Sequence, residues 1–213
     1  MVKTFLRGIN LSLSLLIIIP TFSSCANVKN IFEGNNNKQI NFSVSIPKWK
    51  NTDSLATTKI SRAMPITDTS FGTDKAFGMI ADVSDGSNYT TEIDKEVVLY
   101  NTVNKMWETT ADHYWPGTNK TVNFYAYYPT GISTNITHTV GSSPILSYTV
   151  PDNVSDQIDI MTATNNNVNG NTNSSTSLTF NHIFSAVQFN IGSSGMPNGT
   201  ITGIALNNIL CKG

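Results

Sequence analysis

Apolar and polar residues alternate in short runs along this chain. Residues 39–46 show the alternation most clearly, because every second residue is apolar: Ile40, Phe42, Val44 and Ile46. A period of two is that of a β-strand with one face against a core. Pro47 ends the run, since proline cannot donate a hydrogen bond to a strand ladder. We therefore predict a strand over 39–46 with its apolar face buried.

Residues 121–128 repeat this period with large side chains on both faces. One face carries Val122, Phe124, Ala126 and Tyr128, and the other carries Asn123, Tyr125 and Tyr127. Such a run predicts a core strand.

The remaining patterns are also typical of strands, because none shows sustained helical periodicity with caps. Residues 85–88 predict a turn, and the Asn-rich tract 165–175 predicts a loop. Many short strands between Gly, Pro and Asn turns indicate an all-β sandwich with Greek-key connections. The further predicted strands are 75–83, 96–100, 105–110, 146–150, 157–163, 177–180, 186–191 and 200–207.

The overall composition fits a neutral extracellular β protein. The chain has 213 residues, of which 39% are hydrophobic and 13% are charged, with a formal net charge of -1. This length suffices for one large domain. Because no basic patch is present to attract phosphates, we do not expect nucleic acid as a partner.

The first 24 residues have the pattern of an export signal. Lys3 and Arg7 supply the positive charge, residues 11–19 form a short apolar stretch, and small residues precede Cys25. This pattern resembles a bacterial lipobox, in which the cysteine is acylated. Ordinary signal cleavage near Ser24 is the alternative. In the acylated protein, residues 25–38 would form a polar tether between the lipid and the domain.

The sequence predicts no catalytic centre, cofactor or metal site. His113, His138 and His182 lack metal-ligand spacing. For His182, which lies in a core-like run, we expect a structural role rather than a catalytic one. Asp152, Asp156 and Asp159 lack the glycine and the terminal glutamate of a calcium loop. A disulfide is also not expected, because Cys211 has no partner if Cys25 is acylated. A hydrolase is the weakest functional hypothesis.

Taken in order, five segments resemble the fimbrillin superfamily, and specifically its Mfa-like and FimA-like lipoprotein pilins of the Bacteroidetes. The segments are Trp107, 114–116, 124–129, 159–163 and 178–187. The resemblance implies a transthyretin-like β-sandwich. It implies that residues 39–213 form the N-terminal domain of a two-domain protein whose C-terminal domain is missing here.

The resemblance also implies an assembly route. The subunit would be exported through the periplasm as a lipoprotein, acylated (palmitate) at Cys25 and held at the outer membrane. An arginine-specific protease would cut between Arg62 and Ala63 and release the first strand, with Ile40, Phe42, Val44 and Ile46. A strand from a neighbouring subunit would fill the groove by β-strand addition. The product would be a fimbria at the cell surface, with this chain as a structural and adhesive subunit.

Two alternatives stay open. Arg62 is equally well read as an ordinary solvated loop arginine. The protein could instead be a monomeric outer-membrane surface lipoprotein that binds a glycan or another host or bacterial surface ligand through stacked aromatic side chains. The aromatic residues in question would otherwise pack a core: Trp107, Tyr114, Trp115, Tyr125 and Tyr127.

Overall fold

A computed structural model describes residues 38–47, 66, 69–171 and 175–185, together with residues 200, 202, 203, 207, 210 and 212. The chain divides into two compact units, Met1–Gly34 and Asn35–Gly213, and every described residue belongs to the second.

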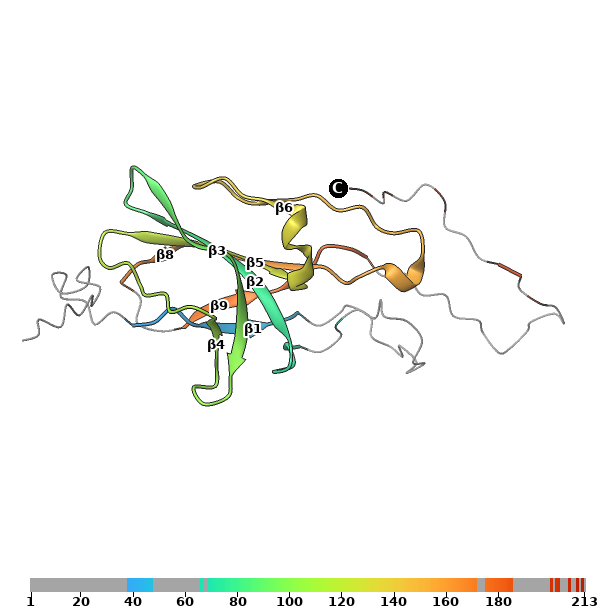
Figure 1. Cartoon of the computed structure of the whole chain (residues 1–213), viewed down its shortest axis with the longest axis horizontal. Helices are drawn as coiled ribbons and strands as arrows, with labels where there is room; N and C mark the ends of the chain where they lie inside the picture. Colours follow the sequence, from blue (N-terminus) through green and yellow to red (C-terminus); the bar gives the residue numbers. More distant parts are fainter. Residues whose placement is uncertain are drawn as a thin grey trace, which may run out of the picture. The chain divides into compact units, whose positions relative to one another are not determined.

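The regular secondary structure of the described part is almost all β-strand, as predicted (Figure 1). Eight strands form one sheet in the order β10-β8-β5-β2-β3-β4-β1-β9, and β6 and β7 form a separate hairpin. Two short 3-10 helices, η2 (Thr130–Asn135) and η3 (Val154–Asp156), lie in the connections. The strands are β1 (Phe42–Ser45), β2 (Ala76–Ser84), β3 (Tyr89–Asn101), β4 (Met106–Thr109), β5 (Thr121–Tyr128), β6 (Ile136–Thr137), β7 (Ile145–Leu146), β8 (Met161–Asn169), β9 (Thr176–Thr179) and β10 (Asn181–His182).

The large sheet folds over itself into two layers. β3 pairs with β2 along most of its length, and its last residues pair with β4. Figure 1 shows β4, β1 and β9 beneath β2, β5 and β8. The two ends of the sheet meet because β9 and β10 are separated by Phe180 alone, yet β9 pairs with β1 and β10 pairs with β8. The all-β sandwich prediction is confirmed.

The main core fills the space between the layers. The predicted alternation is confirmed in β5, where Phe124 and Ala126 face this core. The core comprises Ile40, Phe42, Ile46, Phe71, Phe77, Met79, Ala81, Val83, Ile93, Val98, Trp107, Trp115, Val122, Phe124, Ala126, Met161, Ala163, Leu178 and Phe180.

A second, smaller core covers the opposite face of β2 and β5. Ile80, Tyr125 and Tyr127 point into it, and residues of η2 and β6 close over them. β2 therefore has apolar neighbours on both faces, and eight of its residues, from Phe77 to Ser84, are buried. This arrangement explains why Tyr125 and Tyr127 are buried rather than offered to a ligand.

The Asn-rich tract is not all loop, and the prediction for 165–175 was wrong in part. β8 continues to Asn169 because its backbone pairs with β5 as far as Thr121 opposite Asn169. A bulge interrupts the pairing beside Asn123, whose side chain accepts a hydrogen bond from the backbone N–H of Asn167. Asn167 has a φ of 57°, a conformation that asparagine tolerates better than most residues.

Other strand boundaries also moved. The turn at 85–88 is confirmed by the backbone bond from the Asp85 N–H to the Asn88 carbonyl, and this turn starts β3 at Tyr89, well before the predicted 96. The predicted strand 146–150 is reduced to Ile145–Leu146, and 157–163 becomes a strand only from Met161. The predicted strand 186–191 and half of 200–207 lie outside the described residues.

Candidate functional site

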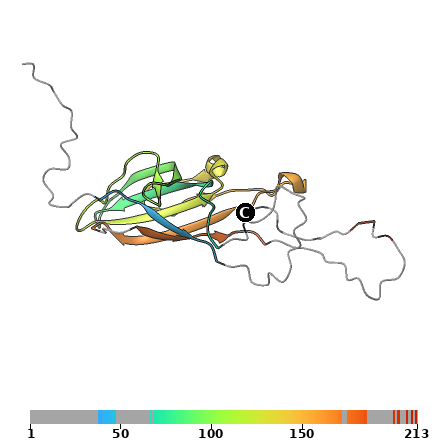
Figure 2. The same ribbon diagram turned by 90° about the horizontal axis from the view of Figure 1, so that it is seen from below.

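The first strand is inserted between two others rather than added at an edge. β1 pairs in parallel with β9 over its whole length, and Phe42 lies opposite Trp107 of antiparallel β4. Figure 2 shows β1, in blue, crossing the layer that also contains β9. This inserted strand is also the first described strand in the chain.

The inner face of β1 supplies a large share of the main core. Ile40 and Phe42 are 0% exposed and Ile46 is 2% exposed, while Val44 packs against the core from a partly buried position. The Phe42 ring meets those of Phe77 and Phe124 edge to face at 6.3 and 5.5 Å. Burial of three such side chains is worth roughly 5–9 kcal/mol. Without β1, a deep apolar groove would face water.

Backbone hydrogen bonds hold the segment at both ends. The Ile40 N–H donates to the His113 carbonyl at 2.7 Å, and the Trp115 N–H donates to the Lys38 carbonyl at 3.1 Å. At the other end the Ile46 N–H donates to the Thr69 carbonyl at 2.9 Å.

Side chains on the outer face of the segment make further contacts. The Gln39 amide donates to Asp112 at 3.1 Å. The Ser43 hydroxyl lies 3.1 Å from that of Ser177, and the Ser45 hydroxyl lies 3.2 Å from that of Thr179. The groove thus has an apolar floor and a polar rim.

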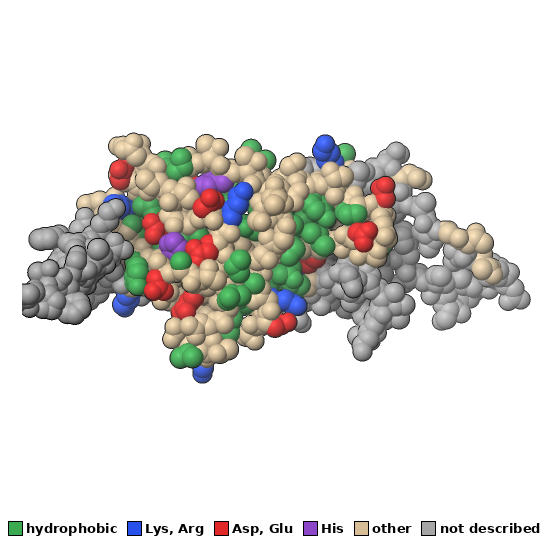
Figure 3. Space-filling view, in the orientation of Figure 1, with side chains coloured by type: hydrophobic (Ala, Val, Ile, Leu, Met, Phe, Trp, Pro, Cys, Tyr) green, Lys and Arg blue, Asp and Glu red, His purple; other side chains and the backbone are tan. Residues whose placement is uncertain are grey.

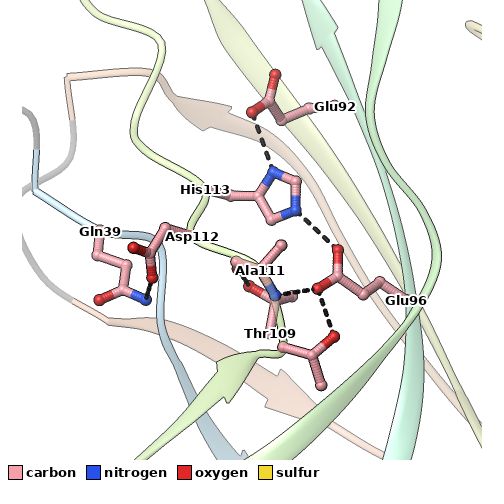
Figure 4. A network of polar contacts seen from close by, with 8 residues as sticks. Gln39, Glu92, Glu96, Thr109, Ala111, Asp112 and His113 are labelled. Atoms are coloured by element: carbon pink, nitrogen blue, oxygen red, sulfur yellow. Dashed lines mark hydrogen bonds and ion pairs between the residues drawn. The ribbon is translucent and has the colours of Figure 1, made fainter. Parts of the chain in front are cut away.

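A charged network lies beside the N-terminal end of this segment (Figure 4). His113 sits between two carboxylates of β3, with Nε2 2.8 Å from Glu96 and Nδ1 3.1 Å from Glu92. Glu96 also accepts hydrogen bonds from the Thr110 hydroxyl and the Ala111 backbone N–H. These contacts fix the position of the 110–113 backbone, whose His113 carbonyl receives the Ile40 N–H.

The network shifts the pKa values of two of its groups. Burial alone would lower the pKa of His113, but the hydrogen bonds and charges of Glu96 and Glu92 outweigh it and raise that pKa above 6.5. Burial alone would raise the pKa of Glu96, but hydrogen bonds from Ala111, His113 and Thr110 hold it below 4.5. The charged pair is therefore the favoured state in mildly acidic solution.

The other two histidines are also paired with carboxylates. His138 lies 2.9 Å from Asp82, which also accepts hydrogen bonds from Thr91 and Gly141. His182 lies 2.7 Å from Asp159, as the structural role predicted for it requires. Acidic side chains stand next to both histidines visible in Figure 3. Within the described ranges, no three His, Cys, Asp or Glu side chains come together as metal ligands.

The protein-family comparison matches a fimbrillin-like model to residues 61–213, which is most of the chain. The chain belongs to the fimbrillin-like family. Among solved structures, a fimbrial protein from Bacteroides vulgatus ATCC 8482 is similar at 20% identity with a TM-score of 0.43. The alignment covers 68% of this chain and 45% of that protein, so the chain spans less than half of its solved neighbour. No match was found among curated proteins.

The predicted site residues of this fimbrillin-like chain divide into two groups. Ile40, Phe42, Val44 and Ile46 come together on the core side of β1, as their alternation predicted. Cys25, Arg62 and Ala63 lie outside the described residues. The described residue that follows Arg62 most closely is Ile66, whose backbone N–H donates to Asp159 at 2.9 Å.

The aromatic residues proposed as an alternative ligand site are mostly inside the fimbrillin-like sandwich. Trp107 is 6% exposed, Trp115 is 2% exposed and Tyr125 is 8% exposed, whereas Tyr114 is 40% exposed. Buried rings cannot stack on a sugar, so these residues act in packing. Among the described helices, none has the length and apolar character needed to cross a membrane.

Sequence reasoning missed the carboxylate partners of the histidines. Glu92 and Glu96 are four residues apart, which would place them on the same face of a strand, and His113 follows 17 residues after Glu96. Only strand pairing brings the three together. The spacing of Glu92 and Glu96 indicates that two acids share one face of a strand. It does not indicate that His113 is their partner.

Proposed function

We propose that this chain is a structural subunit of a bacterial surface fimbria, assembled by exchange of its first strand. The observation that carries the proposal is the place of β1. It is the first described strand of the chain, yet it lies inside a sheet and covers an apolar core. Once the link to β2 is cut, β1 is no longer joined to the strands that follow it, and the groove it vacates offers unpaired backbone groups on both sides.

The proposal includes the steps before exchange, which the pattern of the leader and the family membership support. Residues 1–24 direct export, Cys25 receives a lipid that holds the subunit at the outer membrane, and residues 25–38 act as a tether. Cleavage between Arg62 and Ala63 then separates β1 from β2, because the connection between these strands contains the cut. Arg7 and Arg62 are the only arginines in the sequence. An arginine-specific protease consequently has a single target beyond the leader.

The role as a subunit accounts for the absence of a convergent catalytic arrangement among the described side chains. Each histidine is engaged by one or two carboxylates within the fold, and the aromatic rings are mostly in the core. The exposed outer surface is then available for contact with other subunits.

Treatment of the purified chain with an arginine-specific protease tests the proposal directly. We expect a product that begins at Ala63 and that exchanges its first strand for an added, labelled peptide of residues 38–47, since the groove accepts a strand supplied by another molecule. The Arg62→Gln variant is the matched control and should stay whole and take up no peptide. Cleavage after which the first strand cannot be exchanged, or resistance of Arg62 in the folded chain, would count against the proposal.

A further inference from the structure

The outer face of residues 38–47 contains one polar group that is badly placed. The Oδ1 atom of Asn41 is buried and has no hydrogen-bond partner among the described residues. Its neighbours on the same face are matched: Gln39 donates to Asp112, and Ser43 and Ser45 face hydroxyls of β9. A buried acceptor that loses its water without gaining a donor destabilises the folded state.

The polar contacts of Gln39, Ser43 and Ser45 can fix the register of the strand, which the apolar face cannot do alone. A slip of two residues leaves the alternation of an incoming strand unchanged, so its apolar side chains would still face the core. The same slip would take a donor away from Asp112 and would leave only one of the two hydroxyl pairs with Ser177 and Thr179 in line. The polar rim therefore distinguishes the native register from a register shifted by two residues, and the apolar floor does not.

We propose that β1 is a mismatched occupant of its own groove, with Asn41 as the mismatch, and that the strand replacing it fits better. The replacing strand belongs to a neighbouring fimbrial subunit and has apolar residues at the places of Ile40, Phe42 and Ile46. It has a hydrogen-bond donor where Gln39 stands and hydroxyls where Ser43 and Ser45 stand. It has no amide where Asn41 stands. This inference rests on the proposed function, because it specifies the partner of the same groove.

The mismatch gives exchange a direction. When one strand replaces another of the same pattern, backbone hydrogen bonds and apolar burial are nearly equal before and after. A difference at one buried polar group then decides which strand is bound at equilibrium. One such group corresponds to about a tenfold preference.

The first test uses the full chain and needs no exchange. Asn41→Ala removes the unmatched acceptor and should raise the midpoint of thermal unfolding. Asn165→Ala is the matched control, since Asn165 is also a partly buried strand asparagine but donates to the Ser177 carbonyl. That variant should lower the midpoint. A fall in the midpoint with Asn41→Ala would overturn the inference.

The second test uses the chain cut at Arg62 and fluorescent peptides of residues 38–47, followed by polarisation. The peptide with Ala in place of Asn41 should bind about tenfold more tightly than the native peptide. A Gln39→Glu peptide, which sets a second carboxylate against Asp112, should bind more weakly. Equal binding of all three would overturn the inference while supporting strand acceptance. If no peptide binds but Asn41→Ala stabilises the full chain, the proposed function is contradicted and the mismatch at Asn41 is still established.

Discussion

β1 and β2 are both strands of alternating apolar residues, yet they hold opposite positions in the fold. β2 is hydrogen-bonded on both sides along its length, to β3 and β5, and has a core on each face. β1 is bonded fully to β9, meets β4 only at Phe42, and has a core on one face. The comparison teaches that a strand can be central to packing while it is paired over less of its length and has the core on only one face.

Removal of a core ring from each strand gives the largest expected effect. Phe42→Ala and Phe77→Ala should each lower the free energy of unfolding by about 3–5 kcal/mol, because both rings are fully buried in the same cluster. Excess peptide 38–47 should restore stability to the Phe42→Ala chain alone, as measured by denaturant unfolding with and without peptide. Equal recovery of stability in both variants would contradict the prediction that the peptide replaces β1 and not β2.

A smaller loss of stability is expected from a substitution at Gly78 of β2, which lies against the ring of Tyr127. A Cβ added to Gly78 would overlap the ring of Tyr127 on β5, so Gly78→Ala should cost about 1–3 kcal/mol of unfolding free energy. At Gly131 an added Cβ meets no atom within 4 Å. Gly131→Ala is therefore the matched control, and chemical denaturation should show it to be neutral or slightly stabilising. A neutral Gly78→Ala would mean that β2 is less tightly fixed than the comparison holds.

The attachment of the β1 end should depend on pH. His113 has a raised pKa in the folded chain, so its contribution to stability is complete below 6.5 and is lost as pH rises through the folded value. Glu96 has a lowered pKa, so its contribution is present above 4.5 and is lost as pH falls through the folded value. Stability from this pair is thus greatest between these limits.

Denaturant unfolding at about pH 5.5 and about pH 8.5 should show a loss at the higher pH on the order of 1 kcal/mol or less, since the network is partly exposed to solvent. His113→Gln should remove most of that difference. A pH dependence that survives unchanged in His113→Gln would show that other groups are responsible.

The smallest expected effect concerns the hydroxyl pairs of β1 and β9. A double-mutant cycle with Ser43→Ala and Ser177→Ala should give a coupling of about 0.5 kcal/mol, because both hydroxyls can also bond to water. The cycle is measured from denaturant midpoints. Zero coupling would show that the polar rim adds nothing to the hold on β1.

Prediction from the sequence succeeded where a strand has one clear inner face. The strand at 121–128 and the inner face of 39–46 were assigned correctly because their alternation is regular and local, although β1 itself covers only Phe42–Ser45. It failed where polar residues form strands through pairing alone, as in the first half of β3 and the Asn-rich end of β8. In those places the backbone is held by hydrogen bonds to a neighbouring strand, and the side chains carry no apolar pattern.

The candidate site shows the same division. The core-facing residues of β1 were predictable, but their neighbours were not, because the partners Trp107 and Ser177 come from distant parts of the chain. The buried state of Tyr125 and Tyr127 likewise depended on η2 and β6, which cover an outer face that an isolated sandwich would leave open.

The sequence by itself determined that the chain forms short strands, and which face of β1 and β5 points inward, since a period of two is a local property of the backbone. Tertiary structure alone decided that β1 lies between β4 and β9, that His113 meets Glu92 and Glu96, and that the Asn41 Oδ1 atom has no hydrogen-bond partner among the described residues. The physical reason is that strand order, unlike strand formation, is set by contacts between residues far apart in the chain.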